Sequence, residues 1–122
     1  MKNKILCLGN EFIEEDSFAL KVGEQLSKEL PQIQFINVKD SFQLMEFLNV
    51  YDDVVVLDVV SGLKDVKVLG VNDLQENKIM TTHDFDAGFV IRLFENKSLR
   101  IIGIPMKGNI NTTKENVKKL IK

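Results

Sequence analysis

The chain has 122 residues, the size of one domain, with a net charge of −2, 44% hydrophobic residues and 28% charged residues. These values are ordinary for a globular protein, and a chain of this length can bury a stable core without disulfide bonds or a structural metal. The sequence has no basic block, which argues against a nucleic-acid partner, and no apolar run reaches membrane-spanning length.

The N-terminus and the single cysteine bear on where the protein works. The opening residues MKNKILCLGN are basic at first, but the apolar run is short and meets Gly9 and Asn10, unlike a signal peptide. Cys7 has no second cysteine to pair with, which suits the cytoplasm, and its apolar neighbours predict a small buried side chain. We therefore expect a cytoplasmic protein, and a monomer.

The first third of the chain alternates strand and helix. Lys4 to Gly9 is an apolar segment that predicts a strand. From Ser17 to Leu30 apolar residues recur every four positions, with Ala19 and Gly23 beside them, which predicts a helix with one buried face. The recurring residues are Phe18, Val22, Leu26 and Leu30. Pro31 ends this helix, and Ile33 to Val38 forms the second strand.

A short helix and the most apolar strand come next. Asp40 or Ser41 can cap the helix. The helix carries the apolar residues Phe42, Met45 and Leu48, among others. Asp53 to Val60 is the most β-prone segment, and its uninterrupted apolar run predicts a central strand covered on both faces. Asp65 to Val71 is a weaker strand that suits the edge of a sheet.

The last third of the chain predicts two helices around one strand. His83 to Glu95 has the apolar spacing of a helix, and Leu99 to Pro105 is a strand stopped by its proline. Thr112 and Glu115 have the spacing of a capping box, which predicts that the final helix opens at Thr112.

This order of elements predicts an α/β fold in one domain over residues 1–122. We expect a three-layer α/β/α sandwich around a mostly parallel five-stranded sheet with one antiparallel edge strand. Functional groups in such folds gather beyond the carboxyl ends of the strands. Polar groups at these positions are Asn10 and the acids through Asp16, Asp58 of the central strand, and His83.

Each of these residues also has a purely structural interpretation. Asp16 precedes a helix, where a carboxylate accepts backbone N–H bonds, while Glu14 and Glu15 suit a solvated turn. His83 suits a helix cap or the surface. Asp58 is harder to explain structurally, because a carboxylate in an apolar strand is costly to bury without a partner or cation.

Four segments, taken in order, resemble the hydrogenase maturation proteases. They are LCLGNEFIEEDSFALKVGEQL, VVVLDVV, TTHDFDAGFVIRL and IIGIP. The family has a strand, Gly-Asn, an acid pair and a helix; then an Asp ending the central strand; then a His opening the next helix; and then a strand ending Gly-x-Pro. The resemblance spans Ile5 to Pro105.

The resemblance implies a peptidase that removes the C-terminal extension of a nickel-iron hydrogenase large-subunit precursor after nickel insertion. It makes Asp16, Asp58 and His83 the metal ligands. Asp16 and Glu15 become the candidate catalytic carboxylates, in an aspartic-type reaction, and Asn10 a candidate substrate-binding residue. The chain departs from the family in having Ser17 in place of a usual glycine.

Two carboxylates and one imidazole suit nickel or zinc, and three protein ligands leave positions open for substrate groups. The resemblance implies nickel supplied by the substrate, for which zinc or another divalent ion can substitute in vitro. Two roles stay open. In the first, the ion polarises the scissile carbonyl or activates water. In the second, it only positions the C-terminal extension, while Glu15 or Asp16 transfers protons as a general acid or base.

Two alternatives also stay open. One is a receiver-like signalling domain phosphorylated at Asp58, with Lys107 after the last strand. Receivers, however, place acids directly at the end of the first strand, where this chain has Leu8, Gly9 and Asn10. The other alternative is a catalytically silent homologue of the proteases.

Overall fold

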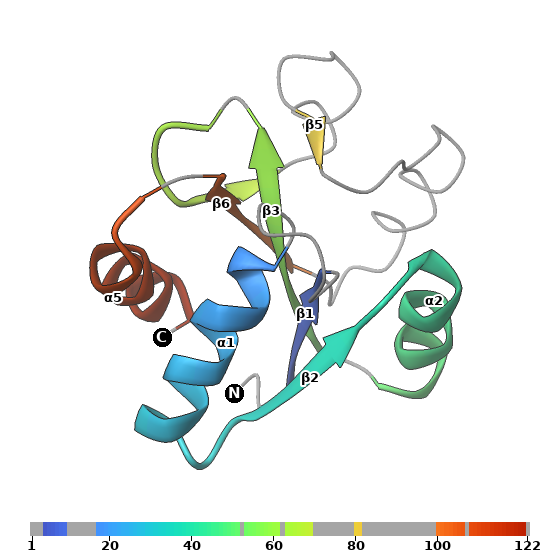
Figure 1. Cartoon of the computed structure of the whole chain (residues 1–122). Coiled ribbons are helices and arrows are strands. Elements are labelled where there is room, and N and C mark those ends of the chain that lie inside the picture. Colours follow the sequence, from blue (N-terminus) through green and yellow to red (C-terminus); the bar gives the residue numbers. More distant parts are fainter. Residues whose placement is uncertain are drawn as a thin grey trace.

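The computed structural model describes residues 4–9, 17–51, 53–61, 63–69, 80–81, 100–106 and 108–121 (Figure 1). In chain order its elements are β1 (Lys4–Leu8), α1 (Phe18–Glu29), β2 (Gln34–Val38), α2 (Ser41–Val50), β3 (Val55–Ser61), β4 (Lys67–Leu69), β5 (Met80–Thr81), β6 (Arg100–Pro105) and α5 (Ile110–Ile121). None of the described helices is long and apolar enough to cross a membrane.

The sheet has the predicted mixed character. Its strand order is β2-β1-β3-β6-β4, and the short strand β5 pairs with β3 off this path. The pairs β1–β2, β1–β3 and β3–β6 are parallel, whereas β4 lies antiparallel to β6 at the edge. The predicted α/β fold with a mostly parallel sheet and an antiparallel edge strand is confirmed. The antiparallel β5 was not predicted.

Helices cover both faces of the sheet and make three layers (Figure 1). Successive side chains of a strand point to opposite faces, so β1, β3 and β6 each contribute to two hydrophobic clusters. The cluster beneath α1 and α5 contains Ile5, Cys7, Ala19, Val22, Leu26, Ile33, Val55, Leu57, Val59, Ile102, Ile104 and Val117. The cluster on the α2 side contains Leu6, Leu8, Val38, Leu44, Val54, Val56, Val60, Leu69 and Ile101.

Cys7 is buried, as its apolar neighbours predict, and lies directly beneath α1. Burial raises the pKa of its thiol to about 12. A Cβ atom added to Gly23 would lie 2.5 Å from the Cys7 sulfur, so the missing side chain of Gly23 lets α1 approach β1. The buried face of α1 is the predicted one, with Ala19, Val22 and Leu26 turned to the sheet.

The helix caps were predicted correctly at α2 and wrongly at α5. Asp40 caps α2, because its Oδ1 accepts a hydrogen bond from the Gln43 N–H at 2.8 Å. At α5 the cap is Asn109, whose Oδ1 accepts from the N–H groups of Asn111 and Thr112 at 2.8 and 3.1 Å. The helix therefore begins before Thr112, which lies within its first turn.

Two further predicted helices are the one that became α2 and the one from His83 to Glu95. In α2 the fully buried side chain is Leu44, whereas Phe42 is 82% exposed in the first turn. The helix predicted from His83 to Glu95 lies outside the described residues.

Candidate functional site

Asp58 lies in the central strand β3 with only 1% of its surface exposed. Its neighbours Leu57 and Val59 belong to the cluster under α1 and α5, so alternation directs Asp58 to the α2 face. In the parallel pairing with β6, Asp58 stands opposite Gly103. The sheet therefore places a carboxylate on the face that carries the aliphatic cluster beneath α2, and Lys67 of β4 stands on the same face, opposite Gly103.

The β6 side of Asp58 is tightly packed. A Cβ atom at Gly103 would lie 2.8 Å from Cδ1 of Leu63 and 3.1 Å from Cδ1 of Leu69. Within the described part of the chain, the Oδ2 atom of Asp58 is buried without a hydrogen bond, although the residue does take part in another polar interaction. Burying a carboxylate among such neighbours costs free energy that a nearby cation would offset.

The ends of β1 and β5 flank the position of Asp58. Cys7 is the last β1 residue paired with β3, opposite Leu57, so Asp58 comes one residue beyond that pair. One edge of β3 is taken by β6 as far as Val60, and β5 must therefore use the edge that β1 uses. Hence β5 lies in line with β1, beyond its carboxyl end, as Figure 1 also shows.

The direction of β5 brings the chain back toward Asp58. The strand is antiparallel to β3, with Met80 opposite Ser61 and Thr81 opposite Val60. The chain therefore reaches Thr81 while running toward the level of Asp58, and His83 follows two residues later in the sequence. No sequence signal predicted this pairing, because a strand of two residues has no periodicity to detect.

The other predicted site residues, Asn10, Glu15, Asp16 and His83, lie outside the described residues. Their assembly with Asp58 into one site therefore stays a prediction. Ser17 occupies the N-cap position of α1, directly after Asp16. Among the residues that the structure describes, no group of three or more His, Cys, Asp or Glu side chains could hold a metal ion.

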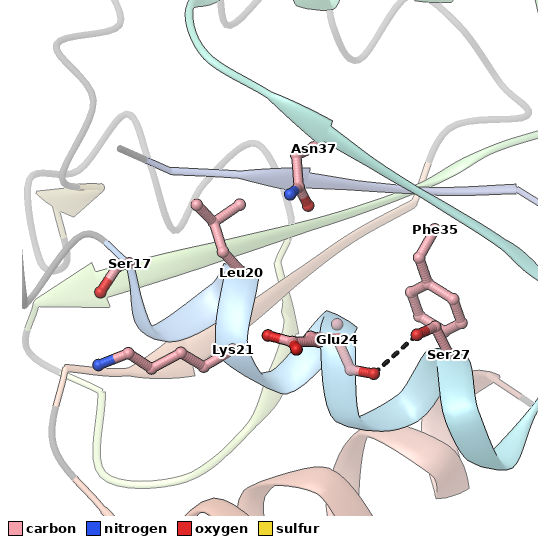
Figure 2. A pocket seen from close by; sticks show the side chains of 8 residues that line it. Ser17, Leu20, Lys21, Glu24, Ser27, Phe35 and Asn37 are labelled. Atoms are coloured by element: carbon pink, nitrogen blue, oxygen red, sulfur yellow. Dashed lines mark hydrogen bonds between the residues drawn. The ribbon is translucent and has the colours of Figure 1, made fainter. Parts of the chain in front are cut away.

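A groove of about 360 Å³ lies between α1 and β2 (Figure 2). Its lining residues are Ser17, Leu20, Lys21, Gly23, Glu24, Ser27, Phe35 and Asn37. Phe35 and Asn37 stand opposite Ile5 and Cys7 in the parallel register, which places the groove on the α1 face. The groove is thus on the face opposite Asp58, and sequence reasoning did not find it.

No family model matches the chain, and neither does any curated protein. Among solved structures, the chain is similar to an uncharacterised protein from Wolinella succinogenes, with a TM-score of 0.60 and 18% identity over 98% of this chain and 92% of that chain. It is also similar to the hydrogenase 2 maturation peptidase from Thaumarchaeota archaeon SCGC_AB-539-E09, with a TM-score of 0.50 and 17% identity over 98% and 96%. At these identities the similarity establishes the fold.

Proposed function

We propose that the protein is an endopeptidase that removes the C-terminal extension of a nickel-iron hydrogenase large-subunit precursor after nickel insertion. The observation that carries the proposal is the buried carboxylate of Asp58, flanked by the carboxyl end of β1 and by β5. A solved structure of the same fold is described as a hydrogenase 2 maturation peptidase, which agrees with this assignment.

Chain connectivity supports a shared site. Asn10 follows Gly9, Asp16 precedes Ser17, and His83 comes two residues after Thr81. An extended residue spans at most about 3.6 Å, so these candidates are tethered closely to described residues. A crossover helix between the parallel strands β1 and β2 begins at the carboxyl edge of the sheet, so α1 starts at the edge that β5 approaches.

The proposed ligands suit a metal carried by the substrate. Asp16, Asp58 and His83 would supply two carboxylates and one imidazole, a donor set that nickel accepts. Three protein ligands leave positions on the ion for groups of the precursor. The precursor and its nickel would then bind together more tightly than either alone, which couples cleavage to completed nickel insertion.

The topology disfavours the receiver alternative. The flavodoxin-like sheet of receivers has the order 2-1-3-4-5 with parallel strands. In this chain β4 is antiparallel to β6, and β3 also pairs with the antiparallel β5. Metal titration separates the two functions. The peptidase assignment predicts that the affinity for nickel or zinc falls in a His83→Ala variant, whereas metal binding by a receiver does not depend on His83.

The proposal is tested with purified protein and large-subunit precursors of the host's hydrogenases, in nickel-loaded and nickel-free forms. We expect mass spectrometry to show loss of the C-terminal extension from the nickel-loaded precursor alone. Binding without cleavage would identify a catalytically silent homologue. Efficient cleavage of a nickel-free precursor would show that the proposed coupling to substrate nickel is wrong.

A control separates nickel on the substrate from nickel on the protein. The protein is loaded with nickel, desalted and mixed with a precursor that cannot hold nickel. We expect no cleavage, because the site needs ligands that only the precursor's own metal centre supplies.

A further inference from the structure

Within the described residues, β2 is the end strand of the sheet and pairs with β1 along one edge only. The Gly9 N–H donates to the Val38 carbonyl at 3.2 Å, so the backbone groups of Val38 face β1. Residues of a strand present their N–H and C=O groups alternately to the two sides. Phe35 and Asn37 therefore direct theirs to the outer edge of β2.

Among the residues that the structure describes, none pairs with the outer edge of β2 over a short, defined stretch. Beyond the strand, the Lys39 N–H already donates to Oε1 of Gln43 at 2.8 Å. This stretch therefore runs from Phe35 to Asn37. Outward N–H and C=O groups at the end of a sheet form a template for one kind of ligand, an extended polypeptide.

The groove between α1 and β2 runs alongside this stretch. Figure 2 shows the side chains of Phe35 and Asn37 extending from β2 toward α1. Leu20 and Phe35 supply apolar surface, and the exposed side chains of Lys21 and Glu24 supply both charges. A strand added to β2 would direct every second side chain toward this groove, whose volume of about 360 Å³ is that of a small ligand pocket.

We propose that the outer edge of β2 binds the C-terminal extension of the precursor as an added β-strand, with alternate side chains in the groove beside α1. This inference rests on the proposed function, because that function supplies the occupant. Main-chain hydrogen bonds to Phe35 and Asn37 provide the affinity, and the groove selects the side chains.

The geometry separates this binding site from the chemistry. Neighbouring strands lie about 4.8 Å apart, so a strand added to β2 runs roughly 14 Å from β3, where Asp58 lies. About four or five extended residues cover that distance. The edge thus holds a part of the extension remote from the scissile bond.

A proline substitution tests the role of the backbone. Asn37→Pro removes the outward N–H, and proline is tolerated where a strand's N–H faces away from the sheet. The control Asn37→Ala removes the same side chain but keeps the N–H. We expect Asn37→Pro to raise the KM for the nickel-loaded precursor about tenfold relative to Asn37→Ala, with kcat little changed.

Amide hydrogen exchange on the unmodified protein tests the same inference without a variant. The amides of Phe35 and Asn37 should become protected when the nickel-loaded precursor is added, while those of Ile36 and Val38, which face β1, should not change. Protection that instead rises with protein concentration alone would assign the edge to a second copy of the chain and overturn the inference.

The two readouts also separate this inference from the proposed function. Protection of the amides without cleavage of the precursor would support the peptide-binding edge and contradict the peptidase function. Cleavage without protection of the amides would support the peptidase function and overturn the peptide-binding edge, provided that Asn37→Pro and Asn37→Ala have equal KM values. Neither protection nor cleavage would overturn both.

Discussion

At the scale of single residues, Asp58 is the residue on which the assignment turns. It is 1% exposed in the middle of the sheet, where an aliphatic side chain would pack without any desolvation cost. Burial of this carboxylate costs free energy, and the proposed cation would offset that cost alongside the polar interaction that Asp58 already makes.

We expect Asp58→Asn and Asp58→Ala to abolish processing of the nickel-loaded precursor. Both changes remove the charge, and the domain should unfold at the same or a higher temperature because a buried carboxylate is no longer desolvated. Thermal unfolding and the cleavage assay measure the two effects. Asp65→Ala, at an exposed carboxylate, is the matched control and should change neither.

Normal cleavage by the Asp58→Asn protein would remove Asp58 from the site. A large loss of stability with cleavage intact would instead give this carboxylate a purely structural role.

At the scale of the elements, α1 depends on two close contacts, one with β1 and one with α5. The first is the approach of Gly23 to Cys7, which places the helix directly on the sheet. The second is an ion-pair network in which Glu29, near the end of α1, contacts Lys114 and Lys118 of α5. Each contact leads to a separate test.

Gly23→Ala should destabilise the protein. The added Cβ would lie 2.5 Å from the Cys7 sulfur, and overpacking of this kind costs about 1–3 kcal/mol, which exceeds the roughly 1 kcal/mol gained in helix propensity. The double variant Gly23→Ala with Cys7→Ala removes the sulfur and should recover part of the loss. Urea unfolding measures both, and a single variant as stable as the wild type would show that α1 can shift freely.

The ion-pair network should make stability depend on pH. Hydrogen bonds from Lys114 and Lys118 lower the pKa of Glu29 below its ordinary value of 4.5. A carboxyl group with a lowered folded-state pKa stabilises the protein above its unfolded-state pKa, and this contribution is lost as the pH falls through the folded-state pKa.

The test compares thermal unfolding of the wild type and Glu29→Gln across acidic and neutral pH. The wild type should be the more stable at neutral pH, and the difference should vanish at strongly acidic pH. The pairs are partly exposed, so high salt should shrink the difference as well. A difference that does not change with pH would show that the network contributes nothing to stability.

At the scale of the whole molecule, the sheet brings segments that are distant in sequence to one edge. β1 and β3 are parallel neighbours, so their carboxyl ends meet there, and β5 extends the line of β1 beyond its end. On the opposite side of the sheet plane, β2 and α1 form the groove that we propose as a peptide site. The two proposals thus assign the chemistry and the binding of the substrate to separate places of one fold.

The sequence by itself determined the strands other than β5, the helices α1, α2 and α5, and the place of Asp58 in the central strand. The valine-rich run around Asp58 predicted a central strand, and the spacing of Val22 and Leu26 predicted the buried face of α1. Asp40 and Ser41 were the two predicted caps of α2, and Asp40 is the cap. These features depend on residues within a few positions of one another, and local patterns encode them directly.

Only the tertiary structure decided which strand edges pair and which have no partner among the described residues. The pairing of Thr81 with Val60 joins segments far apart in the chain, and no local pattern indicates it. The outward direction of the Phe35 and Asn37 backbones follows from the Val38 bond to Gly9. The cap of α5 went to Asn109 because its side chain reaches two free N–H groups, which outweighed the capping-box spacing at Thr112. Strand pairing and the choice between two candidate helix caps depend on the positions of residues in space, and the linear sequence pattern does not contain those positions.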